Sequence, residues 1–182
     1  MTDIENVMEI AKGIGFDTAA PLDPKTIVLH EEVREMCAEG KCNAYGKNWT
    51  CPPACGDLDH CRSVIAKYSE GVIIQTIGEL EDAMDYESMM DTAKRHNENF
   101  RALSEQVLSR YPGALCLGAG GCKVCEKCAF PEPCRFPNKA FSSMEGYGML
   151  VSEVCTENDV PYYYGQNTIA FVGCFLLNHT IL

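Results

Sequence analysis

The sequence predicts an α/β fold, in which about four mostly parallel strands form one sheet with helices on its faces. Segments typical of strands alternate with segments typical of helices, which favours right-handed crossovers between parallel strands. The length of 182 residues suits one domain, and neither an internal repeat nor a low-complexity linker divides the chain. We therefore expect a single domain over residues 1–182, with a ferredoxin-like α+β fold as the alternative.

The first elements follow from apolar periodicity and from turn residues. Residues 3–12 carry apolar side chains at the spacing of a helix. Later apolar runs have the composition of strands, most clearly residues 71–77, which are rich in β-branched side chains. The expected strands are residues 26–30, 71–77, 113–119 and 168–177.

The stretches between the later strands predict helices. Asp57 is a good N-cap for a helix over residues 58–68. Residues 89–111 carry apolar side chains at steps of four and three, and this pattern ends just ahead of a proline. Ser142 and Glu145 form a capping-box pattern, which predicts a further helix before the last strand.

The charge balance narrows the classes of partner. The chain has 15 basic and 26 acidic side chains, for a formal net charge of −11. Nucleic acids and anionic membrane surfaces are therefore disfavoured, because both are bound by clustered Lys and Arg. The sequence also lacks a secretory signal pattern and an apolar window of about 18 residues. These features predict a cytoplasmic protein, whose cysteines stay reduced and more often bind metal than form disulfides.

Nine of the twelve cysteines fall into two short blocks. The other three, Cys116, Cys155 and Cys174, lie among apolar neighbours, where a free cysteine usually packs as a small core residue. The first block contains Cys37, Cys42, Cys51, Cys55 and Cys61, and the second block contains Cys122, Cys125, Cys128 and Cys134.

The second block has the more specific spacing. Its C-x2-C-x2-C core, followed by a fourth cysteine beside proline, is close to the bacterial ferredoxin run that holds a [4Fe-4S] cluster. The last gap is five residues instead of three, so Cys134 can complete its own cluster or ligate the neighbouring one. Zinc is the alternative, although a structural zinc site usually joins two C-x2-C pairs across a longer spacer.

The first block has a looser spacing, C-x4-C-x8-C-x3-C-x5-C, and its five thiols are one more than a cluster requires. Cys37, Cys42 and Cys51 are the expected ligands, with either Cys55 or Cys61 as the fourth. Cys55 lies in the tighter loop. Cys61 lies in the first turn of a predicted helix, where the helix dipole favours a thiolate.

Both blocks follow a predicted strand and precede a predicted helix. The first block comes after residues 26–30 and the second after residues 113–119. Loops in these positions share the carboxyl edge of a parallel sheet, where open α/β sheets bind their ligands. We therefore expect two metal groups side by side at one edge of the sheet.

Several motifs in combination resemble a known family. They are C-x4-C-x2-YGKNW-x-CPP, GAGGC-x2-C-x2-C, PCRFP and SSMEGYG, and they span roughly residues 30–177. This combination resembles a family of cysteine-rich, predicted metal-binding proteins of anaerobic bacteria and archaea. The resemblance implies metal binding, with iron–sulfur clusters as the expected metal groups.

The expected function is electron transfer by an iron–sulfur protein with two [4Fe-4S] clusters, which exchanges electrons with a redox partner protein. The sequence contains no Ser-His-Asp set, phosphate loop or dinucleotide fingerprint, and it names no catalytic residue. One alternative is an enzyme in which a labile cluster position activates a substrate. The other is a structural zinc protein that serves as an interaction module. Whether the protein is an enzyme stays open at this point.

Overall fold

The computed structural model describes residues 2–178, and within them four strands form one sheet in the order β1-β2-β4-β3. Every pair of neighbouring strands is antiparallel. The strands are β1 (Thr18–Leu22), β2 (Glu70–Glu79), β3 (Leu115–Leu117) and β4 (Thr168–Leu177). The α-helices are α1 (Asp3–Ile14), α2 (Glu31–Met36), α3 (Leu58–Ile65), α4 (Tyr86–Arg110) and α5 (Val151–Glu157).

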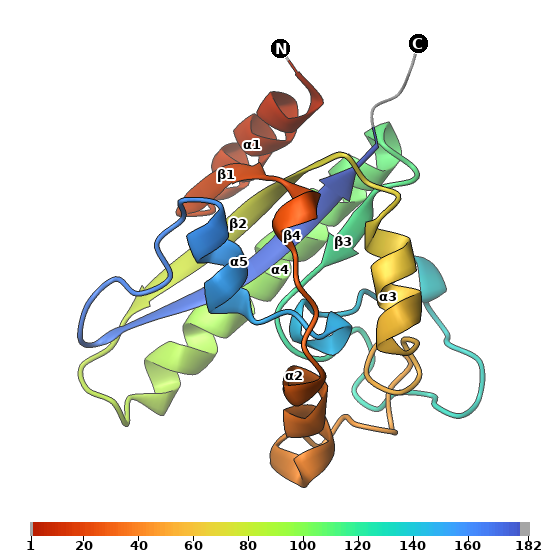
Figure 1. Ribbon diagram of the computed structural model, residues 1–182. Coiled ribbons are helices and arrows are strands. Elements are labelled where there is room, and N and C mark those ends of the chain that lie inside the picture. The colour runs from red at the N-terminus through yellow and green to blue at the C-terminus, as the bar shows by residue number, and fades with distance from the viewer. Residues whose placement is uncertain (1, 179–182) are drawn as a thin grey trace.

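The sheet lies between two layers of helices, each with its own core (Figure 1). Helices α1 and α4 cover one face, where Leu103 and Val107 pack against Phe175 of β4. Helices α3 and α5 cover the other face, where Ile65 and Val154 pack against inward side chains of β2 and β4. Helix α2 and the cysteine-rich loops lie together beyond one end of the sheet.

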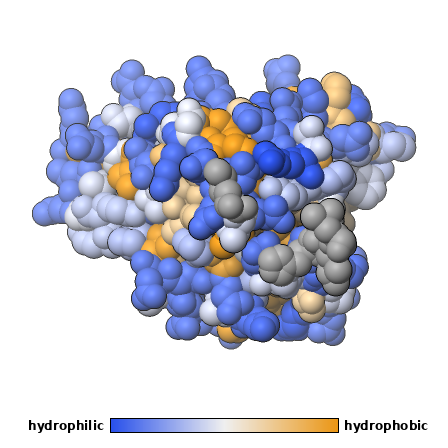
Figure 2. Space-filling view, turned by 90° about the horizontal axis from the view of Figure 1, so that it is seen from above, coloured by the Kyte–Doolittle hydropathy of each residue, from blue (hydrophilic) through white to orange (hydrophobic). Residues whose placement is uncertain are grey.

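At the opposite end of the molecule α1 begins and β4 ends. The surface seen from that end is mainly hydrophilic, with hydrophobic side chains in small groups (Figure 2). Among residues 2–178, no helix has both the length and the apolar character needed to cross a membrane.

The predicted parallel sheet is wrong, and the path of the chain gives the reason. β2 and β3 are connected by α4 and run in the same direction, as a crossover connection requires. They are not neighbours, however, because β4 lies between them and runs in the opposite direction. Between β1 and β2 the chain passes down to α2, through the first cysteine block and back along α3 (Figure 1). The chain therefore enters β2 at the same end of the sheet at which it left β1, so β1 and β2 are antiparallel. The ferredoxin-like alternative predicts an antiparallel sheet but not this connectivity, because α4 separates β2 from β3.

The predicted strand over residues 26–30 is also wrong. Asp23 accepts a hydrogen bond from the Lys25 backbone N–H at 3.0 Å and begins a 3₁₀ turn, Pro24–Thr26. Of this segment, Leu29 forms only an isolated bridge with Met149. The first strand is instead β1, which contains a proline that is tolerated because β1 lies at the edge of the sheet.

The other predicted segments are largely confirmed. β2 and β4 pair along their whole length, and α4 covers the predicted helix. Asp57 caps α3, since its carboxylate accepts the His60 backbone N–H at 2.7 Å. The helix predicted from Ser142 is interrupted: a 3₁₀ turn, Glu145–Tyr147, stops at Gly148, which has a φ of 85°, and α5 begins only at Val151. A side chain at Gly148 would also meet Leu58 Cδ2 at 2.6 Å.

His96 lies in the core between α4 and the sheet. It is fully buried, its Nδ1 lies 3.0 Å from Thr76 Oγ1, and its ring contacts three phenylalanines, Phe16, Phe100 and Phe171. Burial lowers the pKa of His96 to about 4, and the neighbouring Arg95 guanidinium adds to the shift. His96 is therefore a neutral core residue at neutral pH.

This burial predicts a loss of stability in acid. In the unfolded chain His96 takes up a proton below about pH 6.5, whereas in the folded chain it does so only below about pH 4. Stability is therefore lost as the pH falls between these values, by about 3 kcal/mol for this residue alone. In His96→Gln, urea unfolding at pH 7 and pH 4.5 should show a clearly smaller drop than in the natural chain. An equal drop in both proteins would contradict this assignment.

Candidate metal centre

The first cysteine block begins where α2 ends. The chain passes from α2 into a π-helical segment, Cys37–Lys41, of a kind often found at functional sites. A loop then carries Cys42, which is exposed, and Cys51, which is buried. Backbone hydrogen bonds tighten this loop, from Gly46 N–H to the Pro52 carbonyl at 2.9 Å and from Cys55 N–H to the Cys51 carbonyl at 3.1 Å. The predicted ligands therefore come from the π-helical segment (Cys37), from one compact loop (Cys42, Cys51 and Cys55) and from α3 (Cys61).

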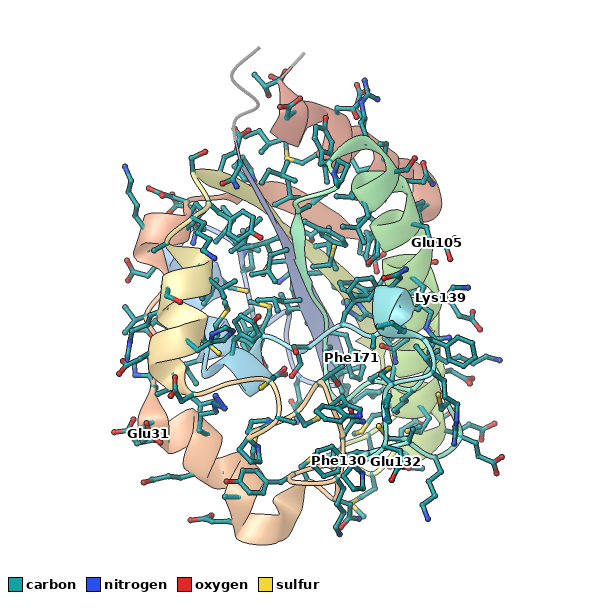
Figure 3. The ribbon with its side chains drawn as sticks, turned by 90° about the vertical axis from the view of Figure 1, so that its right-hand side faces the viewer. Glu31, Glu105, Phe130, Glu132, Lys139 and Phe171 are labelled. Carbon is teal, nitrogen blue, oxygen red and sulfur yellow. The ribbon has the colours of Figure 1, made fainter. Side chains whose placement is uncertain are left out.

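The second block lies in the loop between β3 and the 3₁₀ turn at Glu145. Its four cysteines are all partly exposed. Phe130 and Glu132 of this loop lie at the same end of the molecule as α2 (Figure 3). The Arg135 guanidinium donates to the Lys127 carbonyl at 3.2 Å, which ties the end of the cysteine run back to its middle.

Two side chains of the first block hold the backbone of the second. Asn48 Nδ2 donates to the Cys122 carbonyl at 3.4 Å, and the Cys122 N–H donates to Thr50 Oγ1 at 3.4 Å. Asn48 and Thr50 are both buried, and Thr50 Oγ1 in turn donates to Asn48 Oδ1 at 3.0 Å. We call this pair of residues the clamp. It fixes the first cysteine of the second block against the first block.

Further contacts close the interface between the blocks. Trp49 Nε1 donates to the Glu132 carbonyl at 2.8 Å, and its ring meets Phe130 edge to face at 5.0 Å. A Cβ added to Gly121 would lie 3.5 Å from Cys51 Sγ, so the backbone just before Cys122 touches a thiol of the first block. The expectation that the two blocks lie side by side is confirmed, although the first block does not follow a strand directly.

The thiols of the first block divide into four and one. The pKa of Cys51 is raised to about 11, first by burial and then by the thiols of Cys42, Cys55 and Cys37, against the effect of a hydrogen bond with Thr50. Three other thiols of the block therefore act electrostatically on Cys51. Cys61 is fully buried in α3, and of the other thiols only Cys55 contributes to its raised pKa. Cys61 is the thiol of the first block that belongs to the hydrophobic core, with Leu58 and Ile65.

Arg34 is a buried cation beside this group, and its side chain is only 8% exposed. It donates to the Gly56 carbonyl, and its two terminal nitrogens each lie 4.0 Å from a thiol, one at Cys55 and one at Cys61. Burial raises the pKa of both thiols, and the Arg34 guanidinium opposes that shift. Its Nε is buried and has no hydrogen-bond partner among the residues that the structure describes.

The thiols of the second block form their own group. Burial raises the pKa of Cys122, and the thiols of Cys134, Cys125 and Cys128 raise it further, although a backbone hydrogen bond opposes them. Cys134 thus lies with the thiols of its own block. A cavity of about 970 Å³ opens between the blocks, with Cys42 on one side and Cys122, Cys125 and Cys128 on the other.

This donor set suits a soft metal, because thiols are the preferred ligands of zinc and of iron–sulfur clusters. Over residues 2–178, no three His, Cys, Asp or Glu side chains already converge on a point where one metal ion would sit. The thiols are nevertheless free, and none of the twelve is in a disulfide.

The three cysteines outside the blocks are core residues, as predicted. Cys116, Cys155 and Cys174 are at most 3% exposed. Burial raises the pKa of Cys116 to about 12 and that of Cys155 to about 11, so both stay protonated at neutral pH. Sequence reasoning missed Arg34 and the clamp. The YGKNW-T run that carries Asn48 and Thr50 was a visible signal, whereas nothing local marks Arg34.

An α+β protein with two thiol-rich loops in contact at one end belongs to the class of cysteine-rich, metal-binding proteins. The chain is a member of the family described as predicted metal-binding protein (DUF2284), whose sequence profile matches residues 20–177. Comparison with curated proteins and with solved structures finds no match.

Proposed function

We propose that the protein is an iron–sulfur electron carrier or redox subunit that holds two [4Fe-4S] clusters. The observation that supports this most strongly is the contact between the two cysteine-rich blocks through the clamp, since together the blocks hold enough thiols for two clusters of four thiolates each. The proposed ligands of the first cluster are Cys37, Cys42, Cys51 and Cys55, and those of the second are Cys122, Cys125, Cys128 and Cys134. The reduced thiols are in keeping with a cytoplasmic location.

The test is metal analysis of protein purified without oxygen. We expect about eight irons and eight acid-labile sulfides per chain, because each cluster contributes four of each. Electron paramagnetic resonance of the reduced protein should show coupled signals from two neighbouring clusters. Zinc without sulfide would contradict the proposal and favour a structural zinc module. Iron with a single isolated signal would contradict the two-cluster arrangement.

The proposed partner is a redox protein with an acidic surface. Residues 40–56 and 119–142 contain six basic and two acidic side chains, a net charge of +4, whereas the rest of the chain carries −15. Lys123 and Lys127 are exposed at the cavity between the blocks. A basic surface beside the thiols of an acidic protein would steer a negatively charged partner to this end.

This charge pattern predicts how the clusters react with small oxidants. Lys123→Glu with Lys127→Glu should slow oxidation by ferricyanide severalfold at low salt and speed oxidation by hexaammineruthenium(III), because the local field changes sign. Lys12→Glu with Lys67→Glu makes the same change of charge in α1 and beyond the end of α3, away from the loops. Equal effects of the two variants, measured by stopped flow, would contradict a local docking surface.

The open cavity also favours an enzyme as the second candidate. About 970 Å³ beside the exposed Cys42 leaves room for a small substrate at the first cluster. A cluster with one labile position could then act as a Lewis acid. If neither Cys55 nor Cys61 proves to be needed for iron binding, the first group has an open position and this candidate gains support.

A further inference from the structure

We propose that Arg34 and Glu145 set the reduction potential of the first cluster in opposite directions, and that within residues 2–178 the second cluster has no such pair. The inference rests on the proposed function. It concerns two charged side chains that lie beside the first group of thiols and take no part in ligation.

Arg34 reaches the first group from α2. Arg34 is only 8% exposed. Its guanidinium donates to the Gly56 carbonyl and places its terminal nitrogens 4.0 Å from the sulfurs of Cys55 and Cys61. Its Nε has no hydrogen-bond partner within the described chain, which is unusual for a buried cation. The charge of Arg34 therefore faces the thiols rather than a carboxylate.

Glu145 lies in a turn that contacts the same group, since the Cys55 thiol donates to the carbonyl of its neighbour Gly146 at 3.5 Å. It begins the 3₁₀ turn that packs against α2, and its Oε2 is buried without a hydrogen-bond partner in the described chain. The pKa of Cys37 is raised by burial first, and the thiol of Cys42 and the Glu145 carboxylate raise it further. The Arg34 guanidinium opposes this shift, so the first group has one cationic and one anionic side chain beside it.

The second group is surrounded differently. Its charged neighbours, among them Lys123, Glu132 and Arg135, are exposed to solvent. Water and salt screen exposed charges, whereas buried charges act through a medium of low dielectric constant. Arg34 and Glu145 should therefore influence their cluster more strongly than the exposed charges influence the other.

The direction of each effect follows from the charge change on reduction. A cluster that accepts one electron from a reductant gains one negative charge, while its bonds to the thiolates stay in place. A buried cation and N–H donors to sulfur stabilise the more negative state and raise the potential. A buried carboxylate destabilises that state and lowers the potential.

The experiment is an anaerobic redox titration with dithionite, followed by electron paramagnetic resonance, on protein with a measured iron and sulfide content. Arg34→Gln should move one of the two midpoint potentials to a more negative value, and Glu145→Gln should move the same one to a more positive value. We expect at least a tenfold change in the ratio of reduced to oxidised cluster, or about 59 mV for one electron. Arg135→Gln and Glu132→Gln are the controls, because they make the same charge changes at exposed positions of the second block.

Several outcomes would overturn the inference. One is full iron content in Arg34→Gln and Glu145→Gln with unshifted potentials. Another is a shift of the same sign in these two variants. The third is a shift in the control variants as large as that in Arg34→Gln or Glu145→Gln. If Arg34→Gln does not assemble the first cluster, Glu145→Gln and Arg34→Lys test the inference in its place. Arg34→Lys keeps the positive charge and should shift the potential only slightly, whereas Glu145→Gln should still move it to a more positive value. A natural protein without iron and sulfide would instead refute the proposed function, and the inference with it.

Discussion

Serine in place of Cys55 is expected to remove about half of the iron and half of the sulfide, from about eight atoms of each to about four. Cys55 is partly exposed, lies within electrostatic reach of Cys37 and Cys51, and follows the same tight loop. Cys61 is fully buried in α3 and packs in the core with Leu58 and the other residues of that face. Alanine in place of Cys61 should therefore leave the iron content unchanged.

The measurement is iron and sulfide per chain in both variants, purified under the same oxygen-free conditions. Cys125→Ser provides the comparison, because it should also remove half of the iron while leaving the signal of the first cluster. Loss of iron in Cys61→Ala but not in Cys55→Ser would reverse the assignment of the fourth ligand. Circular dichroism of each variant checks that the fold is intact, since Cys61→Ala leaves a small cavity in a packed core.

Removal of the clamp should have the second large effect, on both stability and the contact between the blocks. Thr50→Val takes away the acceptor of the Cys122 N–H and the donor to Asn48 without changing the shape of the side chain much. Each buried polar group left without a partner costs about 1–3 kcal/mol. We expect Thr50→Val and Asn48→Ala each to lower the free energy of unfolding by about that amount.

The clamp variants should also weaken the magnetic coupling between the two clusters, because the Cys122 backbone is no longer held against the first block. Urea unfolding measures the first effect, and electron paramagnetic resonance of the reduced protein measures the second. Asn138→Ala, at an exposed position in the same loop as the second block, is the matched control and should change neither. A clamp variant with normal stability and unchanged coupling would show that other contacts, such as those of Trp49, hold the blocks together.

The long regular elements were predictable because their patterns are local. The β-branched run of β2 and the apolar stripe of α4 are repeated over enough residues to identify strand and helix. β1 was missed because its alanines and proline do not look like a strand, and it becomes one only by pairing with β2. The strand directions were wrong because the path through the cysteine loops, which reverses the chain, leaves no periodic trace in the sequence.

The candidate site was predictable to a similar degree. The spacing of the cysteines was enough to define two thiol groups and to set the three core cysteines apart. It left Cys55 and Cys61 as equal candidates, because both are close to Cys51 along the chain. Arg34 lies 4.0 Å from both sulfurs, and the difference between the two thiols is that Cys61 belongs to the hydrophobic core whereas Cys55 is partly exposed.

The sequence by itself determined the chemistry of this protein: the number of thiols, their division into two blocks, and the elements with strong local periodicity. The tertiary structure decided which strands are neighbours, that the two blocks lie in contact, and which charges and clamp residues surround them. The physical reason is that spacing and periodicity depend on neighbours along the chain. The contacts of Arg34, Asn48 and Thr50 join residues more than twenty positions apart, and only the folded chain brings them together.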